Sequence, residues 1–154
     1  MRKGVRLGID VGKKRIGVAR SDSEGLLATP VCTVMRETLE QSAAEVVAIV
    51  KEFKAFECVI GLPLSMSGNN SQSTDDARDF AAAVKELLRG EMATVDIRML
   101  DERLTTVSAH AALRTSGKKP SRARDTVDQV AAVILLQQAL DQERATGRPP
   151  GFAI

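Results

Sequence analysis

The sequence has almost no aromatic side chains. Among its 154 residues there is no tryptophan, no tyrosine and only four phenylalanines. The apolar residues, 44% of the chain, must therefore form a core of valine, isoleucine, leucine and alanine. Stacking of bases on aromatic rings is disfavoured as a means of recognition. Any contact with nucleic acid must rely on charged and hydrogen-bonding groups instead.

Histidine and cysteine are also scarce, and this excludes several kinds of site. The single histidine, His110, lies in a helical pattern, and nothing in the sequence supports a histidine-based nucleophilic triad. Cys32 and Cys58 occur separately in apolar, strand-like segments without a nearby histidine or cysteine, so metal binding by them is not expected. We expect both to be buried free thiols in a reducing compartment.

Long apolar runs are absent as well. No apolar run precedes the first predicted strand, so no signal peptide is visible. No stretch approaches the roughly 18 apolar residues of a membrane helix. We therefore expect a cytoplasmic protein with no membrane partner. The net charge is only +2, so a nucleic-acid contact would need local clusters of basic residues.

Apolar periodicity predicts one α/β domain over residues 1–144 and a proline- and glycine-rich tail, 145–154, that we expect to be disordered. The predicted strands are 5–10, 16–21, 26–34, 58–62 and 95–100, and the predicted helices are 39–53, 74–88 (capped by Thr74 or Asp75), 105–113 and 121–144. The first three strands should be antiparallel. The later ones alternate with helices, which predicts a mixed five-stranded sheet with helices on both faces.

Acidic residues stand at the ends of two predicted strands. Asp10 ends the first strand, at the edge where open α/β sheets place ligands, although an aspartate beside glycine also suits a turn. Glu102 follows the strand 95–100. Its neighbour Asp101 should point to the opposite face if the strand continues, and Asp101 could instead cap the next helix. Asp10 and Glu102 are therefore candidate metal ligands.

A third candidate ligand, Asp128, lies within the last predicted helix. Ala131 and Ala132 follow it by three and four residues, so Asp128 borders the apolar face and should approach the sheet. A solvated carboxylate at the edge of that face is the alternative. Asp125 shares the same side but is more peripheral, which makes it a weaker candidate. Three such acids from two strands and a helix suit Mg²⁺, which prefers oxygen ligands.

Basic residues flank the three acids. They are Lys13, Lys14 and Arg15 in the turn after Asp10, and Arg114, Lys118, Lys119, Arg122 and Arg124 in a segment without any acid. Such clusters are typical of phosphate contacts, although a merely solvated loop would look the same. The hydroxyl-rich segment 65–73 precedes a helix and could bind an anion or only cap that helix. Acids next to cations indicate a metal-dependent enzyme that acts on phosphate esters.

Four segments resemble the YqgF family of RuvX-like Holliday-junction resolvase homologues. They are GIDVGKKRIGVARSD at 8–22, VIGLPLSMSGNNSQS at 59–73, DERLTT at 101–106 and VDQVAAVILLQQAL at 127–140, in the family's order and spacing. The resemblance implies a ribonuclease H-like fold and a site in which Asp10, Glu102 and Asp128 hold Mg²⁺ or Mn²⁺. Two departures are Asp125, where the family is more often basic, and Ala139, where an aromatic residue is common.

The resemblance also implies a function. We expect an endonuclease that hydrolyses phosphodiesters, acting at the 5′ end of the 16S rRNA precursor in ribosome biogenesis. The alternative is a Holliday-junction resolvase in DNA recombination and repair, which would act as a two-fold homodimer because it must cut two strands symmetrically. The nucleic-acid partner is thus a structured RNA precursor or branched DNA.

Two other hypotheses come from different classes of protein. The segment GIDVGKKRIGVA also resembles the first phosphate loop of actin-like and sugar-kinase-like ATPases, but those enzymes clasp nucleotide between two such domains and this chain has room for one. A catalytically inert binding module is the other, and retention of all three acids argues against it.

Overall fold

The computed structural model describes residues 1–64, 71–90, 92–101 and 120–154, and side chains in the last of these ranges from residue 129 onward. The elements are β1 (Arg6–Val11), β2 (Arg15–Ser21), β3 (Ala28–Met35), α1 (Leu39–Phe53), β4 (Glu57–Leu62), α2 (Gln72–Leu87), β5 (Asp96–Asp101), α4 (Pro120–Thr146) and β6 (Phe152–Ala153). The predicted helix 105–113 lies outside the described residues.

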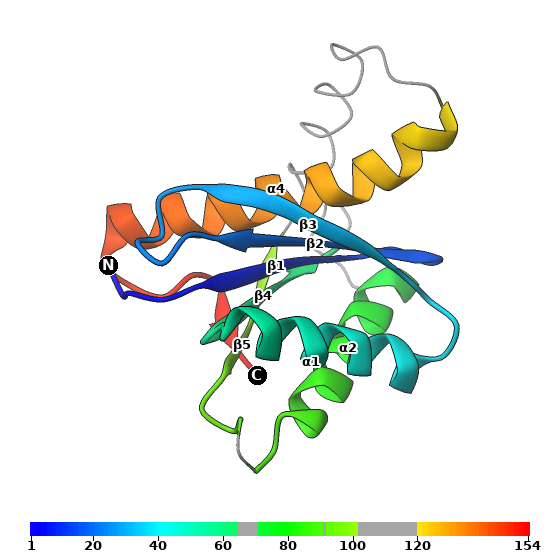
Figure 1. Ribbon diagram of the computed structural model, residues 1–154, viewed down its shortest axis with the longest axis horizontal. Coiled ribbons are helices and arrows are strands. Elements are labelled where there is room, and N and C mark those ends of the chain that lie inside the picture. The colour runs from blue at the N-terminus through cyan, green and yellow to red at the C-terminus, as the bar shows by residue number, and fades with distance from the viewer. Residues whose placement is uncertain (65–70, 91, 102–119) are drawn as a thin grey trace.

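The strands form one mixed sheet in the order β3-β2-β1-β4-β5-β6. The first three are antiparallel neighbours, whereas β4 runs parallel to both β1 and β5. Figure 1 shows α4 on one face of the sheet and α1 and α2 on the other. The predicted class, a mixed α/β sheet with helices on both faces, is confirmed.

Strand alternation divides the core into two layers. Leu7 and Ile9 of β1 pack in the cluster that faces α1 and α2. Val59 of β4 and Leu100 of β5 pack instead with Leu136 and its neighbours on α4. The side of the sheet on which a residue lies can therefore be read from its position along a strand.

The sixth strand corrects the prediction of five strands and a disordered tail. Phe152 of β6 pairs with Met99 of β5 in antiparallel register. Arg98 of β5 fixes the segment before β6, since its Nε donates to the carbonyl oxygen of Pro150 at 2.5 Å. Composition reports only local preference, and here pairing with an open sheet edge overrides it.

The start of α2 differs from the prediction as well. Ser71, and not Thr74 or Asp75, is the N-cap, and its hydroxyl accepts the backbone N–H of Thr74 at 3.3 Å. The Thr74 hydroxyl in turn accepts the backbone N–H of Ser71 at 2.9 Å. This reciprocal capping box begins the helix three residues earlier than Thr74 capping would.

Both cysteines are free thiols, as predicted, but only Cys58 is buried. Burial raises the pKa of the Cys58 thiol to about 12. Cys32 on β3 is half-buried, and the prediction that it is buried is wrong. Its pKa is also raised, mainly by loss of hydration and then by the nearby charges of Glu45 and Glu52.

None of the helices that the structure describes is long and apolar enough to cross a membrane.

Candidate functional site

The carboxyl ends of three parallel strands meet at one edge of the sheet. In the register, Ile9 of β1 lies opposite Ile60 of β4, and Leu62 at the end of β4 lies opposite Asp101 at the end of β5. Asp10 follows Ile9 and is half-buried at this edge. Open α/β sheets bind ligands at such an edge.

Asp10 lies on the face of the sheet that α4 covers. A Cβ atom built on Gly8 would come 2.6 Å from Cβ of Leu136 and 2.8 Å from the carbonyl oxygen of Ala132, so Gly8 faces α4 at very close range. Residues two apart in a strand share a face. Asp10 is therefore on the same side as Gly8, one pleat nearer the carboxyl edge.

The direction of α4 brings residue 128 toward the same edge. Two contacts fix this direction: Gln137 Oε1 accepts the backbone N–H of Ala28 at the start of β3, and Gln129 Nε2 donates to Oγ1 of Thr33 near its end, each at 2.9 Å. Because β3 runs in the same direction as β1, the N-terminal half of α4 lies toward the carboxyl edge. The backbone position of Asp128 is one helical turn beyond Ala132, in the direction of Asp10.

The other acidic candidates are described only in part. Glu102 lies outside the described residues, as do the side chains of Asp128 and Asp125, whose backbones belong to α4. Asp101 is the last residue of β5, half-buried. Within the part of the chain whose side chains are described, no group of three or more acidic, histidine or cysteine residues could hold a metal ion. The predicted ligand set therefore stays a prediction.

The predicted basic turn lies next to Asp10. Gly12 donates its backbone N–H to the carbonyl oxygen of Arg15 at 2.8 Å and closes a tight turn between β1 and β2. Lys13 and Lys14 are exposed at the tip of this turn, whereas Arg15 is half-buried at the start of β2. The second basic cluster is not described at side-chain level: Arg114, Lys118 and Lys119 lie outside the described residues, and Arg122 and Arg124 are described only as backbone of α4.

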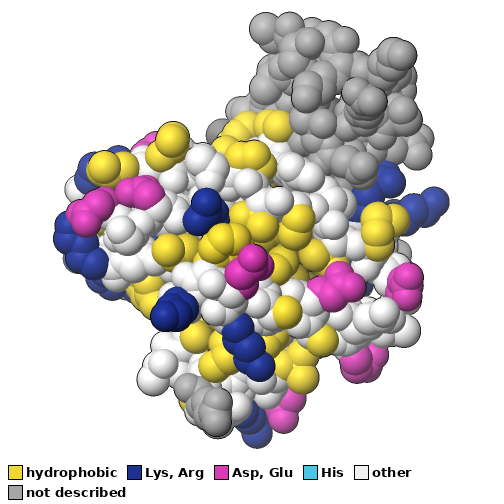
Figure 2. Space-filling model, in the orientation of Figure 1, with side chains coloured by type: hydrophobic (Ala, Val, Ile, Leu, Met, Phe, Trp, Pro, Cys, Tyr) yellow, Lys and Arg dark blue, Asp and Glu magenta, His cyan; other side chains and the backbone are white. Residues whose placement is uncertain are grey.

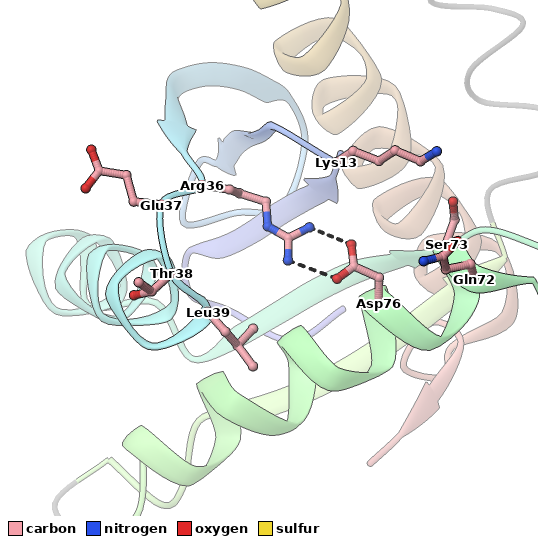
Figure 3. Close-up of a pocket in the computed structure, with 8 residues that line it drawn as sticks. All are labelled: Lys13, Arg36, Glu37, Thr38, Leu39, Gln72, Ser73 and Asp76. Atoms are coloured by element: carbon pink, nitrogen blue, oxygen red, sulfur yellow. Dashed lines mark hydrogen bonds and ion pairs between the residues drawn. The ribbon is translucent and has the colours of Figure 1, made fainter.

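A pocket of about 380 Å³ lies beside this turn, at the starts of α1 and α2 (Figure 3). Its lining residues are Lys13, Arg36, Glu37, Thr38, Leu39, Gln72, Ser73 and Asp76. Within it, Nη1 and Nη2 of Arg36 donate to the two carboxylate oxygens of Asp76 at 2.5 and 2.9 Å. The hydrogen bond from Arg36 lowers the pKa of Asp76 below its ordinary value and outweighs the effect of burial.

Sequence reasoning anticipated only part of this pocket. Lys13 was predicted as a phosphate contact, and the hydroxyl-rich segment before α2 suggested an anion site. Nothing in the sequence near Arg36 marks it as a partner of Asp76, because forty positions separate the two residues. Only the packing of the β3–α1 connection against the start of α2 brings them together.

Comparison with known proteins shows extended sequence similarity to one family. A family model described as RuvX, Holliday junction resolvase, matches residues 4–142. Proteins named "Putative pre-16S rRNA nuclease" from Leifsonia xyli subsp. xyli and Clavibacter michiganensis subsp. michiganensis are 51% and 49% identical, in alignments that span 100% of this chain and 96% and 93% of theirs. The protein of that name from Streptomyces coelicolor is 46% identical over 100% of this chain and 90% of its own.

Solved structures show the same fold at low sequence identity. The structure of T. thermophilus RuvC in complex with Holliday junction substrate superimposes with a TM-score of 0.59 and 18% identity, and covers 95% of this chain and 99% of that chain. A second structure of Thermus thermophilus RuvC gives a TM-score of 0.55 at 18% identity, over 94% and 99% of the two chains. The ribonuclease H-like fold predicted from the sequence is thereby confirmed, with one additional strand.

Proposed function

Because this chain belongs to the RuvX Holliday junction resolvase family, we propose that it is a metal-dependent endonuclease that hydrolyses phosphodiester bonds of nucleic acid in the cytoplasm. The observation that carries the proposal is the position of Asp10. Its half-buried carboxylate stands at the carboxyl end of β1, on the face toward which the N-terminal half of α4 runs. A carboxylate there is suited to bind a cation between the sheet and that helix.

In this proposal Asp10, Glu102 and Asp128 would hold Mg²⁺ or Mn²⁺. Strand alternation supports the choice of Glu102 over Asp101: Leu100 packs on the α4 side, so Asp101 belongs to the opposite side from Asp10. Oxygen ligands from carboxylates match what these hard cations prefer. When bound, two such ions can activate a water molecule and stabilise the leaving oxygen of an in-line displacement.

The chain's own residues would bind and orient the substrate around this centre. Asp10 is a fixed anion that repels a bare phosphate, so exposed cations close to it are needed to hold the strand. Lys13 and Lys14 provide them directly after β1. The basic cluster within residues 114–124 would provide further phosphate contacts along the strand, and their attraction would weaken with added salt.

For the substrate, we propose the 5′ end of the 16S rRNA precursor, with a role in ribosome biogenesis. The names of relatives that are about half identical over nearly their full length support this choice. The second candidate is a four-way DNA junction, favoured by the family description and by the likeness of the fold to RuvC. The second reaction would require a two-fold homodimer, whereas the first would not.

The test compares cleavage of a precursor rRNA 5′ leader and of a four-way DNA junction by one purified preparation, with Mg²⁺ and with EDTA. Asp10→Asn should abolish cleavage of whichever substrate the parent cuts, because it removes a ligand charge and keeps the shape of the side chain. Thermal unfolding should show an intact fold, and binding without metal should persist. Asp79→Asn, the same change on the exposed side of α2, is the control and should cleave as the parent does.

The outcomes separate the alternatives clearly. Cleavage by Asp10→Asn at close to the parental rate would refute the metal assignment. Metal-dependent cleavage of the junction, with the leader left intact, would transfer the function to DNA recombination and repair. A parent protein that binds both substrates but cuts neither would favour an inert binding module.

A further inference from the structure

Arg36 connects three parts of the chain at the edge that carries Asp10. It follows β3, and its Nη1 donates to the carbonyl oxygen of Gly12 at 2.9 Å. Its backbone N–H donates to the carbonyl oxygen of Lys14 at 3.0 Å. Its guanidinium also forms the two-pronged ion pair with Asp76 of α2, as Figure 3 shows. One side chain and its own peptide group therefore hold the β1–β2 turn from both sides of Lys13.

This arrangement fixes the backbone from which Lys13 projects. Lys13 is exposed, and it forms no ion pair with any of the described residues. In Figure 3 its side chain extends across the pocket toward Ser73 at the start of α2. A long lysine side chain loses considerable rotational freedom when it binds a phosphate. A turn held at the carbonyl groups of residues 12 and 14 reduces the additional cost of ordering the backbone.

The charge of Arg36 is already paired with a carboxylate within the protein. Its side chain is 15% exposed and that of Asp76 is 34% exposed, and the two groups meet in the two-pronged geometry that suits guanidinium and carboxylate. The carboxylate neutralises the guanidinium and also orients it toward Gly12. Arg36 is thus poorly placed to bind a phosphate itself and well placed to hold the turn that does so.

We propose that Arg36, oriented by Asp76, is a positioning residue for nucleic-acid binding, which holds the turn of residues 12–14 so that Lys13 contacts a phosphate of the strand beside the pocket. The inference rests on the proposed function and deepens it, because it assigns a role in binding rather than in cleavage to the α1 and α2 side of the Asp10 edge.

The test measures binding of a fluorescein-labelled precursor rRNA leader in EDTA at several salt concentrations. The variants are Arg36→Gln, Lys13→Gln, the double variant and Asp76→Asn. Lys13→Gln should weaken binding and lower the slope of log K against log salt by about 0.7 to 0.9, the contribution of one phosphate contact. Arg36→Gln should reproduce that loss, and the double variant should bind within about twofold of Lys13→Gln alone, since coupled residues are not additive.

Asp76→Asn distinguishes positioning from direct contact by the sign of its effect. If Arg36 only positions the turn, loss of the carboxylate releases the guanidinium from Gly12 and weakens binding. If Arg36 itself contacts phosphate, the same change frees its charge and tightens binding. Glu86→Gln, which removes one partner of the exposed Glu86–Arg89 pair near the far end of α2, is the matched control and should leave binding unchanged.

Three results would overturn the inference: tighter binding by Asp76→Asn, additive effects of Arg36→Gln and Lys13→Gln, or unchanged binding by Arg36→Gln. Thermal unfolding identifies any variant that fails to fold, and Asp76→Asn, which retains the shape of the side chain, still decides the question in that case. Failure of the nuclease proposal is seen separately, as a parent that does not cleave in Mg²⁺, and it leaves the binding measurements interpretable.

Discussion

Gly8 determines how closely α4 can approach the strand that carries Asp10. The nearest atoms to a Cβ at this position would be Cβ of Leu136 at 2.6 Å and the carbonyl oxygen of Ala132 at 2.8 Å. Neither can rotate away, because one is the first atom of a side chain and the other belongs to the helix backbone. The absence of a side chain at residue 8 thus sets the spacing between two elements of the candidate site.

Gly8→Ala should accordingly impair both stability and cleavage. The added methyl group must push α4 away from β1, and overpacking of this kind typically costs about 1–3 kcal/mol of unfolding free energy. Because α4 carries Asp128, the displacement should also lower cleavage per folded molecule, measured beside urea unfolding. Gly90→Ala is the control: its φ of +88° strains alanine, but no atom lies within 4 Å. Full cleavage by Gly8→Ala would show that the site tolerates this displacement.

The residues of the candidate site differ in how far the sequence could reveal them. The position of Asp10 was predictable, since it lies at the end of an apolar strand next to a basic turn, and both are local patterns. Gly8 and Arg36 were not predictable in their roles. The partners of Gly8 lie on α4, at the far end of the chain, and the partner of Arg36 lies on α2. Only tertiary packing creates the contacts on which their proposed roles rest.

Among the elements, the N-terminal ends of β1 and β4 are joined to the last turns of α4 by a largely buried ionic cluster. Arg6 Nη2 donates to Oε2 of Glu143 at 2.7 Å, and Arg2 Nη2 donates to Oε2 of Glu57 at 2.7 Å and also contacts Glu143. The ring of Phe56 lies 4.8 and 5.0 Å from the guanidinium carbons of Arg6 and Arg2. This cluster fastens α4 at the edge opposite the candidate site.

The two carboxyl groups of the cluster have opposite pKa shifts. Burial raises the pKa of Glu57 and prevails over its contacts with Arg2; its Oε1 is buried without a hydrogen-bond partner. Burial also acts on Glu143, but the hydrogen bond from Arg2 and the charges of Arg6 and Arg2 together lower its pKa. Glu143 therefore stabilises the fold above the pKa of an unfolded glutamate, and that stability is lost as the pH falls through its lower folded pKa. The raised pKa of Glu57 has the opposite effect: its contribution to stability is present below the pKa of an unfolded glutamate and is lost as the pH rises through its folded pKa.

Glu143→Gln should destabilise the protein by about 3–5 kcal/mol at pH 7, because it leaves the buried Arg6 without its charged partner. The difference from the parent should persist down to about pH 4.5 and then shrink, since protonated Glu143 resembles glutamine. Urea unfolding at a series of pH values measures this. Glu86→Gln, in an exposed pair, should cost no more than about 1 kcal/mol. A gap between parent and Glu143→Gln that stays constant at low pH would contradict the assignment.

The pairing of β6 with β5 also requires a glycine at residue 151. Gly151 has a φ of +58°, and a Cβ there would lie 1.9 Å from the carbonyl oxygen of Met99. Gly151→Ala should therefore detach β6 from β5, seen as faster amide exchange at Ile154, whose N–H bonds to the carbonyl oxygen of Ile97 at 3.1 Å. Gly147 has a similar φ of +71°, but no atom lies within 4 Å of a Cβ built there, so Gly147→Ala should leave β6 paired. Equally fast exchange in both variants would mean that the positive φ, and not the close approach to Met99, causes the loss of pairing.

At the scale of the whole molecule, charge is mixed rather than concentrated. Figure 2 shows lysine and arginine interspersed with aspartate and glutamate on the face in view, in keeping with a net charge of +2. Attraction of a polyanion must then come from local clusters near the Asp10 edge. The overall charge by itself provides little of it.

Loss of the second basic cluster should consequently change affinity more than chemistry. Changing Lys118, Lys119 and Arg122 to alanine removes three proposed phosphate contacts, each contributing about 0.9 to the salt slope on a duplex. The slope should fall by up to about 2.7, while the rate at saturating substrate falls far less than in Asp10→Asn. Alanine at Lys51, Lys54 and Arg89 removes the same charge near the far ends of α1 and α2 and should leave the slope unchanged. An unchanged slope in the first variant would assign phosphate binding to the β1–β2 turn alone.

The main helices and strands were more predictable than the C-terminal tail. Periodic apolar residues placed α1 at 39–53, where the structure has it, because its amphipathic pattern is regular and Thr38 caps its start. The tail was misjudged because β6 is only two residues long and owes its order to contacts with Arg98 and Met99. Short elements stabilised by distant partners leave little trace in local sequence.

The two margins of the sheet also limit how copies of the protein can associate. At one margin β3 contains Pro30, which has no N–H to offer, and its register with β2 is interrupted by a bulge opposite Val18 and Ala19. At the other, β6 presents only Phe152 and Ala153. Among the described residues, neither margin offers a long, uninterrupted row of backbone groups that could template fibrous aggregation. If two copies pair around a DNA junction, these margins therefore disfavour a continuous intermolecular sheet as the contact between them.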